Sequence, residues 1–388
     1  MTTIPKIAWP EVSARRIERQ FLATPAPADV PLAEVVATML GAHAQVLSAA
    51  ELSVGLRTAG ATRADVRAAL WEDRSLVKTF GPRGTVHLLP AHELPLWCAA
   101  LSAVPRGASP FPPDVRLTEE QQEQVVAAIG EALADACLTI DELGEEVVAR
   151  TGAWAGDLVM PAFQDLWPRW RQVLHRAGWA GVLCFGPNRG RKVTYTRPPA
   201  AAEGATRTDE ALPAFVRRYL RAYGPATPQH FAKWLAAPTG WAAEVFREPA
   251  VGGGIEEVEF EGARGWWVAS GDTEFPAVPA RGVRLLPYFD AYAIAAQPRE
   301  RLFPGKAYQR ALAGGQAGNF PVLLVNGLVA GVWHQRRSGR RTTVTVEPLG
   351  RLTARQEREL GEQVERVGAV LEARPELVLG EVRTGPHA

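Results

Sequence analysis

The residues best suited to chemistry are His43 and Gln45, which interrupt the otherwise apolar stretch MLGAHAQVLSAAELSVGLR (39–57). An imidazole can accept a proton near neutral pH, and a glutamine amide can orient a water molecule. In a continuous helix, residues two apart point about 200° away from each other, so the two groups could not act together. A break at Gly41, followed by extended or turn backbone, would let both side chains face one way. The competing interpretation is that His43 is a buried structural histidine.

Other common catalytic signatures are missing from the sequence. There is no P-loop, GxSxG, HExxH, CxxC or GxGxxG motif, and no pair of catalytic carboxylates stands out. Cys98, Cys137 and Cys184 lie far apart without metal-ligand spacing, which favours free thiols in a reducing cytoplasm. Only five lysines occur, and none of them lies in the 39–57 stretch. Direct attack by water is therefore favoured over attack by a lysine amine that would form a Schiff base. We therefore expect no metal and no cofactor.

The sequence predicts three successive segments, each made of several helices followed by a β-hairpin, and the first of them contains His43 and Gln45. In the first segment, the apolar spacing predicts helices at 11–22, 32–40, 46–58 and 63–72 before a wing around FGPRGTVHLLP (80–90). In the second, capping-box spacings open helices at Thr118 and Thr139, and a third helix is expected over 156–173. The strands WAGVLCFG (179–186) and KVTYTR (192–197) follow. Helices followed by a hairpin are the plan of a winged helix.

The last two parts of the chain complete the predicted organisation. Helices are expected from 209 to 222, from 227 and over 240–248, followed by strands that pair around a turn at 263–264. After residue 276 the pattern becomes β-rich and ends in a helix from 353 to 373. We therefore predict an α+β fold of tandem winged-helix units that form a DNA-binding cleft, with a barrel-like C-terminal unit. The expected domains are 1–112, 113–200, 201–275 and 276–388, and the Pro/Ala-rich stretch 197–207 is an expected linker.

Basic residues gather at the predicted hairpin tips although the net charge is only +1. The sharpest case is HQRRSGRR (334–341), where four arginines around Ser-Gly would repel one another unless an anion lay nearby. Charged turns are also ordinary protein surface, but several such tips together favour duplex DNA as the partner. The predicted DNA-binding residues are Arg336, Arg337, Arg340, Arg341, Arg83, Arg189, Arg191 and Lys192, with Arg264 at a further tip.

Four other residues have two interpretations each. Asp290 could support the site or contact DNA, but a buried aspartate that anchors a strand end is the favoured interpretation. His87 alternates with apolar residues and is expected to have a packing role. His334, a second candidate support residue, could contact DNA or belong to the surface. Trp333 is expected in the core, with insertion into a DNA groove as the alternative.

The stretch around His43-Ala44-Gln45 resembles the AlkZ/YcaQ-like family of bacterial DNA glycosylases, the winged-helix DNA-binding domain-containing proteins. That family has a Gln-hydrophobic-Gln catalytic motif here, with a His-hydrophobic-Gln variant in a subgroup. Matching landmarks are RGTVHLLP (83–90), YGPATPQHFAKWL (223–235), LLPYFDAY (285–292) and LVAGVWHQ (328–335). They cover nearly the whole chain in the expected order. Because His replaces the first Gln, the substrate range of the Gln-Gln members does not carry over.

The resemblance implies a monofunctional glycosylase that hydrolyses the N-glycosidic bond of cationic N7- or N3-alkylpurines, including bulky ones, in duplex DNA. Gln45 would position the water, and His43 would act as general base or electrostatic support. The role would be repair or self-resistance to a DNA-alkylating natural product, and whether the base is flipped stays open. The alternative is a noncatalytic winged-helix DNA binder such as a regulator. With no apolar run long enough for a membrane span and no signal core, we expect a cytoplasmic, nucleoid-associated monomer.

Overall fold

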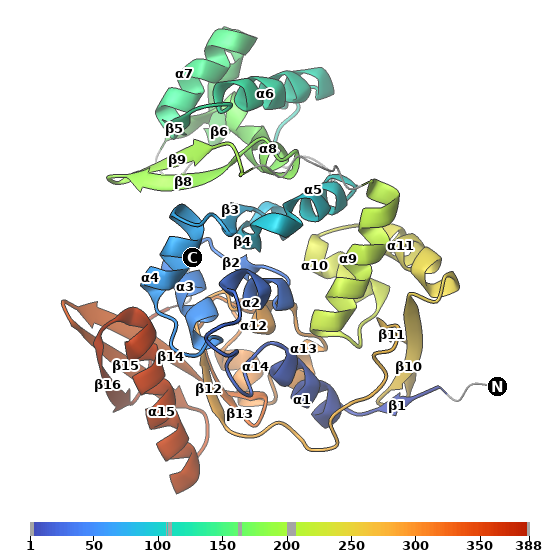
Figure 1. Ribbon diagram of the computed structural model, residues 1–388, viewed down its shortest axis with the longest axis vertical. Coiled ribbons are helices and arrows are strands. Elements are labelled where there is room, and N and C mark those ends of the chain that lie inside the picture. The colour runs from blue at the N-terminus through green and yellow to red at the C-terminus, as the bar shows by residue number, and fades with distance from the viewer. Residues whose placement is uncertain (1–3, 106, 108–110, 162–164, 200–206, 386–388) are drawn as a thin grey trace.

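The chain forms a mixed α+β fold in which small sheets are each covered by helices (Figure 1). The computed structural model describes residues 4–105, 107, 111–161, 165–199 and 207–385. Within these residues the strands form sheets in the orders β1-β10-β11, β2-β4-β3, β5-β9-β8, β6-β7 and β12-β13-β14-β15-β16. No helix in these ranges is long and apolar enough to cross a bilayer.

The first unit carries the candidate catalytic residues. Its elements are α2 (Leu32–Thr38), β2 (Ala42–His43), α3 (Leu47–Leu56), α4 (Arg63–Trp71), β3 (Leu76–Phe80), η1 (Pro82–Gly84), β4 (Val86–Pro90), η2 (Ala91–Glu93) and α5 (Leu94–Ser102). The helices predicted at 32–40, 46–58 and 63–72 are confirmed, and so is a hairpin around 80–90, whereas the helix predicted at 11–22 forms outside this unit. The sequence analysis missed the short strand β2, which pairs antiparallel with β4 and so completes a three-stranded sheet.

The second unit repeats the order of helix, short strand, helix and terminal hairpin. It comprises α6 (Glu119–Ala132), β5 (Cys137–Thr139), α7 (Ile140–Thr151), η3 (Ala153–Gly156), β6 (Leu158–Pro161), β7 (Leu166–Pro168), η4 (Arg169–Val173), α8 (Leu174–Trp179), β8 (Cys184–Arg189) and β9 (Lys192–Thr196). Both capping boxes form, at Thr118 and Thr139. The helix predicted over 156–173 is wrong: β6, β7 and η4 lie there, because Pro161 and Pro168 cannot sit in a helix interior.

The third unit contains α9 (Thr208–Tyr223), α10 (Pro228–Leu235), α11 (Thr239–Val251), β10 (Ile255–Phe260) and β11 (Ala263–Ala269). Ala226 bridges to Trp267, and β1 (Lys6–Ile7) extends the sheet in parallel with β10. The turn predicted at 263–264 lies instead at Glu261 and Gly262, which adopt φ values of 50° and 81°. Glycine tolerates that conformation, and this places the tip two residues earlier.

The C-terminal unit is an open sheet with helices around it. Its elements are β12 (Val283–Leu286), α12 (Ala291–Ala295), α13 (Arg299–Leu302), α14 (Lys306–Arg310), β13 (Val322–Val325), β14 (Leu328–Ser338), β15 (Arg341–Pro348), α15 (Ala354–Leu371) and β16 (Arg374–Leu379). The predicted terminal helix is confirmed as α15, but the sequence analysis missed β16. That strand pairs parallel with β15 after the α15 crossover.

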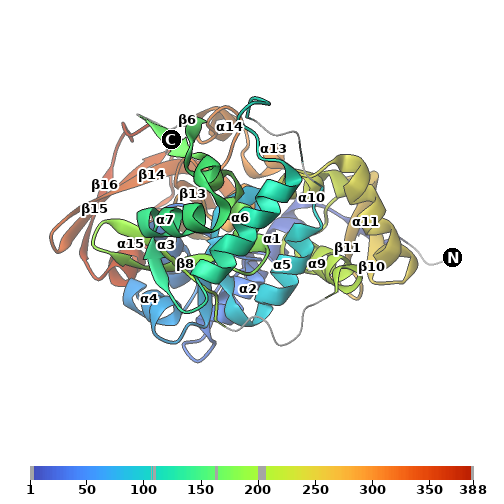
Figure 2. The ribbon, with the colours of Figure 1, turned by 90° about the horizontal axis from the view of Figure 1, so that it is seen from above.

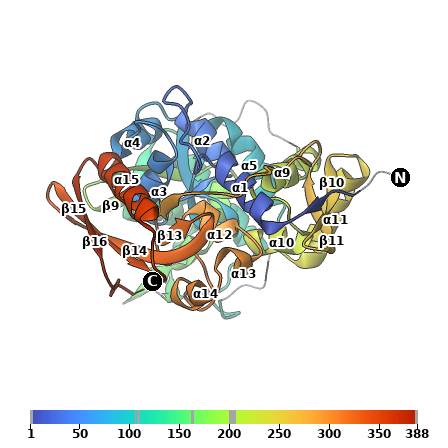
Figure 3. The same ribbon diagram turned by 90° about the horizontal axis from the view of Figure 1, so that it is seen from below.

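The units share apolar cores, so the site elements are held from several sides. One core joins α2–α4 with the second unit and Ala291 at the start of α12, and another joins α5 with α9–α11. Helix α1 (Trp9–Arg19) packs between β10 and β11 on one side and β13 and β14 on the other. Seen from above, α6 and α7 lie over the first unit (Figure 2), and the view from below shows α1 between the third unit and the C-terminal unit (Figure 3).

Candidate active site and nucleic-acid interface

A sharp reversal of the chain separates helix α2 from the candidate catalytic residues. The helix ends at Thr38, and Leu40 and Gly41 then adopt left-handed conformations, with φ values of 55° and 86°. A Cβ on Gly41 would come within 2.9 Å of the Leu89 side chain on β4, so glycine suits this position on two grounds. The chain then enters strand β2. The helix therefore breaks where the sequence predicted.

The imidazole of His43 lies between two aromatic rings in a nearly dry setting. It stacks on Phe289 with ring centroids 4.7 Å apart and an interplanar angle of 27°. On another side it meets His87, its cross-strand partner on β4, at 5.0 Å in an edge contact. Only 8% of His43 is exposed, and its Nδ1 is buried without a hydrogen-bond partner among the described residues. Burial, with a smaller contribution from the charge of Arg83, lowers the pKa of His43 to about 4. The ring is therefore neutral at pH 7.

Gln45 lies at the solvent-exposed end of the same extended segment. The backbone N–H of Ala44 donates to the Val86 carbonyl at 2.7 Å, which continues the pairing of β2 with β4 for one more residue. Ala44 is fully buried, whereas Gln45 is exposed. Ala44 is turned to the core, and Gln45 lies in a bend that follows β2, so no continuous helix holds the side chains of His43 and Gln45 apart.

Asp290 is a buried anchor for the loop that carries Phe289. Its carboxylate accepts two hydrogen bonds from the Arg57 guanidinium, both at 2.8 Å, and one from the Ser53 hydroxyl at 2.6 Å. It also caps α12 by accepting from the N–H of Tyr292. The side chains of Arg57 and Asp290 are both 0% exposed. The carboxylate of Asp290 is therefore not accessible to DNA, and Asp290 is a buried anchor, as the favoured interpretation predicted.

His87 is a packing residue of the first unit, as its alternating pattern predicted. It is 6% exposed, and its Nδ1 lies 2.9 Å from the Thr85 carbonyl, to which it donates. Burial holds the pKa of His87 well below its usual value. The second imidazole beside His43 is therefore neutral, and the charge of Arg83 acts on both rings.

The arginine-rich hairpin joins β14 to β15 and extends away from the core. Its arms pair from Gly331↔Pro348 to Ser338↔Arg341, and Gly339 makes the turn at a φ of 58°. Four exposed arginines occupy this tip: Arg336, Arg337, Arg340 and Arg341. None of the four forms an ion pair with another described residue. The tip therefore concentrates positive charge that no ion pair within the described ranges neutralises.

The base of the same strand joins this hairpin to the site loop. The Nδ1 of His334 lies 3.3 Å from the hydroxyl of Tyr288, next to Phe289. Trp333 is fully buried, and its indole N–H donates to the Leu286 carbonyl at 2.8 Å. Trp333 is thus a core residue, and insertion of its ring into a DNA groove is ruled out.

The remaining predicted DNA-binding residues differ in how far they are already paired. Arg189 donates to Glu142 and to the Cys137 carbonyl, and Lys192 pairs with Asp141 at 2.7 Å. Arg83 lies in the η1 turn, where it donates to the carbonyl of Trp234 on α10 at 2.9 Å. Two more exposed arginines stand at the other tips, Arg191 and Arg264. The hairpin of the second unit is thus largely neutralised by its own acids, unlike the β14–β15 tip.

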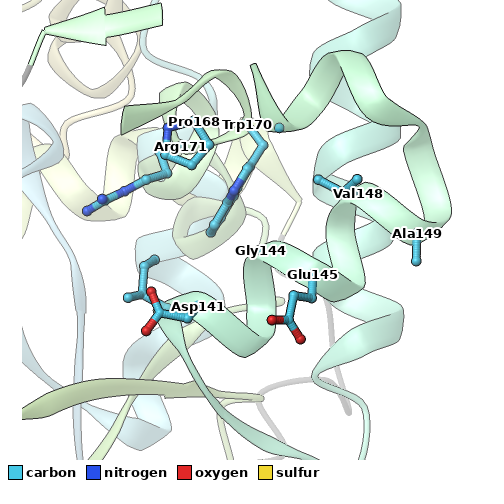
Figure 4. Close-up of a pocket in the computed structure, with 10 residues that line it drawn as sticks. Asp141, Gly144, Glu145, Val148, Ala149, Pro168, Trp170 and Arg171 are labelled. Carbon is cyan, nitrogen blue, oxygen red and sulfur yellow. The ribbon is translucent and has the colours of Figure 1, made fainter. Parts of the chain in front are cut away.

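An open pocket of about 610 Å³ lies elsewhere, between α7 and η4 in the second unit. Figure 4 shows Trp170 and Arg171 on one side and Asp141, Gly144 and Glu145 along α7 on the other. None of its lining residues comes from β2 or from the loop at 287–290, so it is separate from the His43 site. Within the described ranges, no cluster of three or more His, Cys, Asp or Glu residues could hold a metal ion.

Removing the charges of the β14–β15 tip should weaken DNA binding and flatten its dependence on salt. Each phosphate contact contributes about 0.9 to the slope of log affinity against log salt, so alanine at Arg336, Arg337, Arg340 and Arg341 should lower that slope by up to about 3.6. Fluorescence anisotropy on one duplex at several salt concentrations measures this. The matched control, alanine at Arg189 and Lys192, should change the slope by less than about 1, because Glu142 and Asp141 already pair with these residues. An unchanged slope in the fourfold variant would remove the hairpin from the DNA interface.

Comparison with known proteins points to one family. The family model described as "DNA glycosylase AlkZ-like" matches residues 36–370. A protein of Streptomyces sahachiroi described as an interstrand DNA cross-link repair glycosylase is 33% identical over 338 residues, which are 84% of this chain and 88% of that protein. The solved structure of Streptomyces sahachiroi DNA glycosylase AlkZ superposes with a TM-score of 0.76 at 29% identity. The superposition covers 97% of this chain and 100% of that one.

Proposed function

This chain belongs to the AlkZ-like family of DNA glycosylases, and from that premise we propose that it hydrolyses the N-glycosidic bond of cationic N7- or N3-alkylated purines in duplex DNA. The observation that carries the proposal is the chain reversal at Leu40 and Gly41, which places His43 on β2 against the half-buried ring of Phe289, with the exposed Gln45 two residues further on. A helix through these residues would have separated the two groups.

Hydrolysis of a cationic alkylpurine requires few catalytic groups. Alkylation at N7 or N3 already makes the purine a good leaving group, so the protein need not protonate it. It must place a water at the anomeric carbon and stabilise the oxocarbenium-like transition state. The exposed amide of Gln45 would hold the water, and the neutral imidazole of His43 would accept a hydrogen bond from it. As the transition state forms, the water's proton can pass to the same ring.

The three repeats of helices and hairpin are, in this proposal, winged-helix units that line the path of the duplex. They would correspond to residues 1–112, 113–200 and 201–275, with the β-rich unit 276–388 carrying the arginine tip. Three such units around one His43–Gln45 pair suit a monomer that grips DNA on both sides of a single lesion. A regulator would instead be expected to have one reading unit per protomer and a dimerisation element.

Bulky adducts are included in the proposed substrate range. The Streptomyces sahachiroi relative is described as acting in interstrand cross-link repair, and the same class of lesion is a reasonable substrate for this chain. The enzyme would act on the nucleoid in the cytoplasm, either in general repair or in protection of a producer from its own DNA-alkylating product.

The test is release of base from a duplex that contains N7-methylguanine, measured as alkali-labile abasic sites and as free base. The reaction is run in EDTA, since neither a metal nor a cofactor is proposed. A second duplex with a bulky N7-guanine adduct tests whether the substrate range includes bulky adducts. Tight binding to these duplexes without base release from any of them would overturn the proposal and favour the noncatalytic DNA binder.

The pH dependence of base release should reflect a neutral His43. Because the pKa of His43 is lowered to about 4, the neutral ring persists down to that pH and is lost as the pH falls through it. Single-turnover rates should therefore stay within about twofold from pH 8 to pH 5. An ordinary histidine with a pKa near 6.5 would leave only about a tenth of the neutral form at pH 5.5. A rate midpoint near pH 6.5 that disappears in the His43→Gln variant would contradict the assigned protonation state.

A further inference from the structure

Two aromatic rings at the end of β12 stand next to His43, and no role has yet been given to them. We propose that Tyr288 and Phe289 form an aromatic wall that recognises the positive charge of the alkylated base. This inference rests on the proposed function and adds the residues that would distinguish a damaged, cationic base from a neutral one of the same shape.

The wall is continuous with the candidate catalytic residues. Phe289 stacks against His43, and the ring of Tyr288 lies 6.4 Å from that of Phe289 at an interplanar angle of 43°. Both rings are half-buried, so part of each reaches the surface of the site. A base whose sugar was within reach of Gln45 would therefore have these rings as its neighbours.

The surroundings of Phe289 hold it in an unfavourable backbone conformation. Its φ is 54°, a region that bulky residues rarely adopt. Its N–H donates to the Gly318 carbonyl at 2.8 Å, and a Cβ on Gly318 would come within 3.3 Å of the Phe289 Cα. The next residue, Asp290, is fixed by the buried ion pair with Arg57. The strained backbone of Phe289, beside the proposed catalytic residue His43, is explained if the strain turns the Phe289 ring toward a ligand.

Tyr288 is fixed from the side of the DNA-binding hairpin. Its hydroxyl lies 3.3 Å from the Nδ1 of His334, two residues before Arg336 on β14. The same strand that carries the arginine tip therefore also sets the position of this ring.

The chemistry of the surroundings favours an aromatic over an ionic recognition of charge. The carboxylate beside the wall, that of Asp290, is neutralised by Arg57 and is fully buried. His43 is neutral at pH 7, so it does not repel a cation. The face of an aromatic ring attracts cations through its quadrupole, whereas a neutral base gains only stacking. Arg83 is the one cation that acts on the pKa of His43, and its guanidinium is held by the Trp234 carbonyl.

The test compares binding to two duplexes that differ in charge and not in shape. One carries 2′-fluoro-N7-methylguanine, which is cationic and resists hydrolysis; the other carries 2′-fluoro-7-deaza-7-methylguanine, which is neutral. The protein should bind the cationic duplex about 3- to 30-fold more tightly. This affinity ratio should fall in both leucine variants. In Phe289→Leu it should drop below about twofold, and in Tyr288→Leu it should also decrease. Tyr288→Phe keeps an aromatic ring and should therefore keep the full ratio.

The outcomes separate this inference from the proposed function. A ratio near one in the unaltered protein, or a full ratio in both leucine variants, would overturn the aromatic wall while base release from N7-methylguanine continued to support the enzyme. Absence of base release from every alkylated duplex would instead overturn the proposed function. If thermal unfolding shows that Phe289→Leu does not fold, the affinity ratio of Tyr288→Leu, a variant at a half-buried position, decides the test.

Discussion

Replacing Gln45 by alanine should slow single-turnover base release by about 10²- to 10⁴-fold, the usual range for loss of a group that positions a reacting water or its proton. The exposed amide of Gln45 makes no contact in the protein core, so its removal should leave the thermal unfolding temperature unchanged. Affinity for an undamaged duplex should also stay the same, because that binding comes from the phosphate contacts. Quenched-flow measurement of abasic sites with enzyme in excess gives the rate.

His43 provides the matched comparison for Gln45. His43→Ala should slow base release to a similar extent, whereas His43→Gln should retain more activity, because it recreates the Gln-hydrophobic-Gln motif to which the sequence is similar. A rate within threefold of the unaltered enzyme for both alanine variants would remove these residues from the reaction. The double alanine variant should be little slower than the worse single one if the two groups act on the same water.

The part of the site that lies within one short segment could be predicted from the sequence. Gly41 between an apolar helix pattern and the pair His43 and Gln45 predicts a reversal there, and glycine's tolerance of positive φ is a local property. The capping boxes at Thr118 and Thr139 are local in the same sense, since donor and acceptor are three residues apart. Both sets of predictions are confirmed, because no distant residue decides them.

A buried Asp290 was the favoured prediction, but its partners could not be predicted, because they meet it only after folding. Arg57 and Asp290 are 233 residues apart, and Ser53 and Asp290 are 237 apart. Nothing in the pattern around Arg57 indicates a buried cation, since an arginine that follows an apolar helix is ordinarily an exposed C-terminal residue. Phe289 likewise resembles a core aromatic until its contact with His43 is known.

The arginines illustrate a further limit of sequence analysis. Arg189, Lys192 and Arg336 are equally basic in the sequence, and all were predicted to bind DNA. The fold gives Arg189 and Lys192 the acids of α7 as partners, whereas Arg336 forms no ion pair with another described residue. A basic tip predicts a strong phosphate contact only when its charge is still unpaired, and pairing is a tertiary property.

Breaking the buried ion pair behind the site should destabilise the protein by about 3–5 kcal/mol, the largest effect on folding that we expect from a single substitution here. In Asp290→Asn the Arg57 guanidinium would remain fully buried without a countercharge, and in Arg57→Met the carboxylate would remain so. The change in free energy of unfolding can be measured by urea denaturation monitored through tryptophan fluorescence.

The double variant Arg57→Met with Asp290→Leu separates the cost of an unpaired charge from the value of the pair itself. Removing both charges leaves no buried charge uncompensated, so the double variant should lose less stability than the sum of the two single variants. Single variants that each cost under 1 kcal/mol would contradict the role assigned to the pair. Because Asp290 anchors the loop that carries Phe289, the double variant should fold yet release base more slowly, since the ring that stacks on His43 would no longer be held at its φ of 54°.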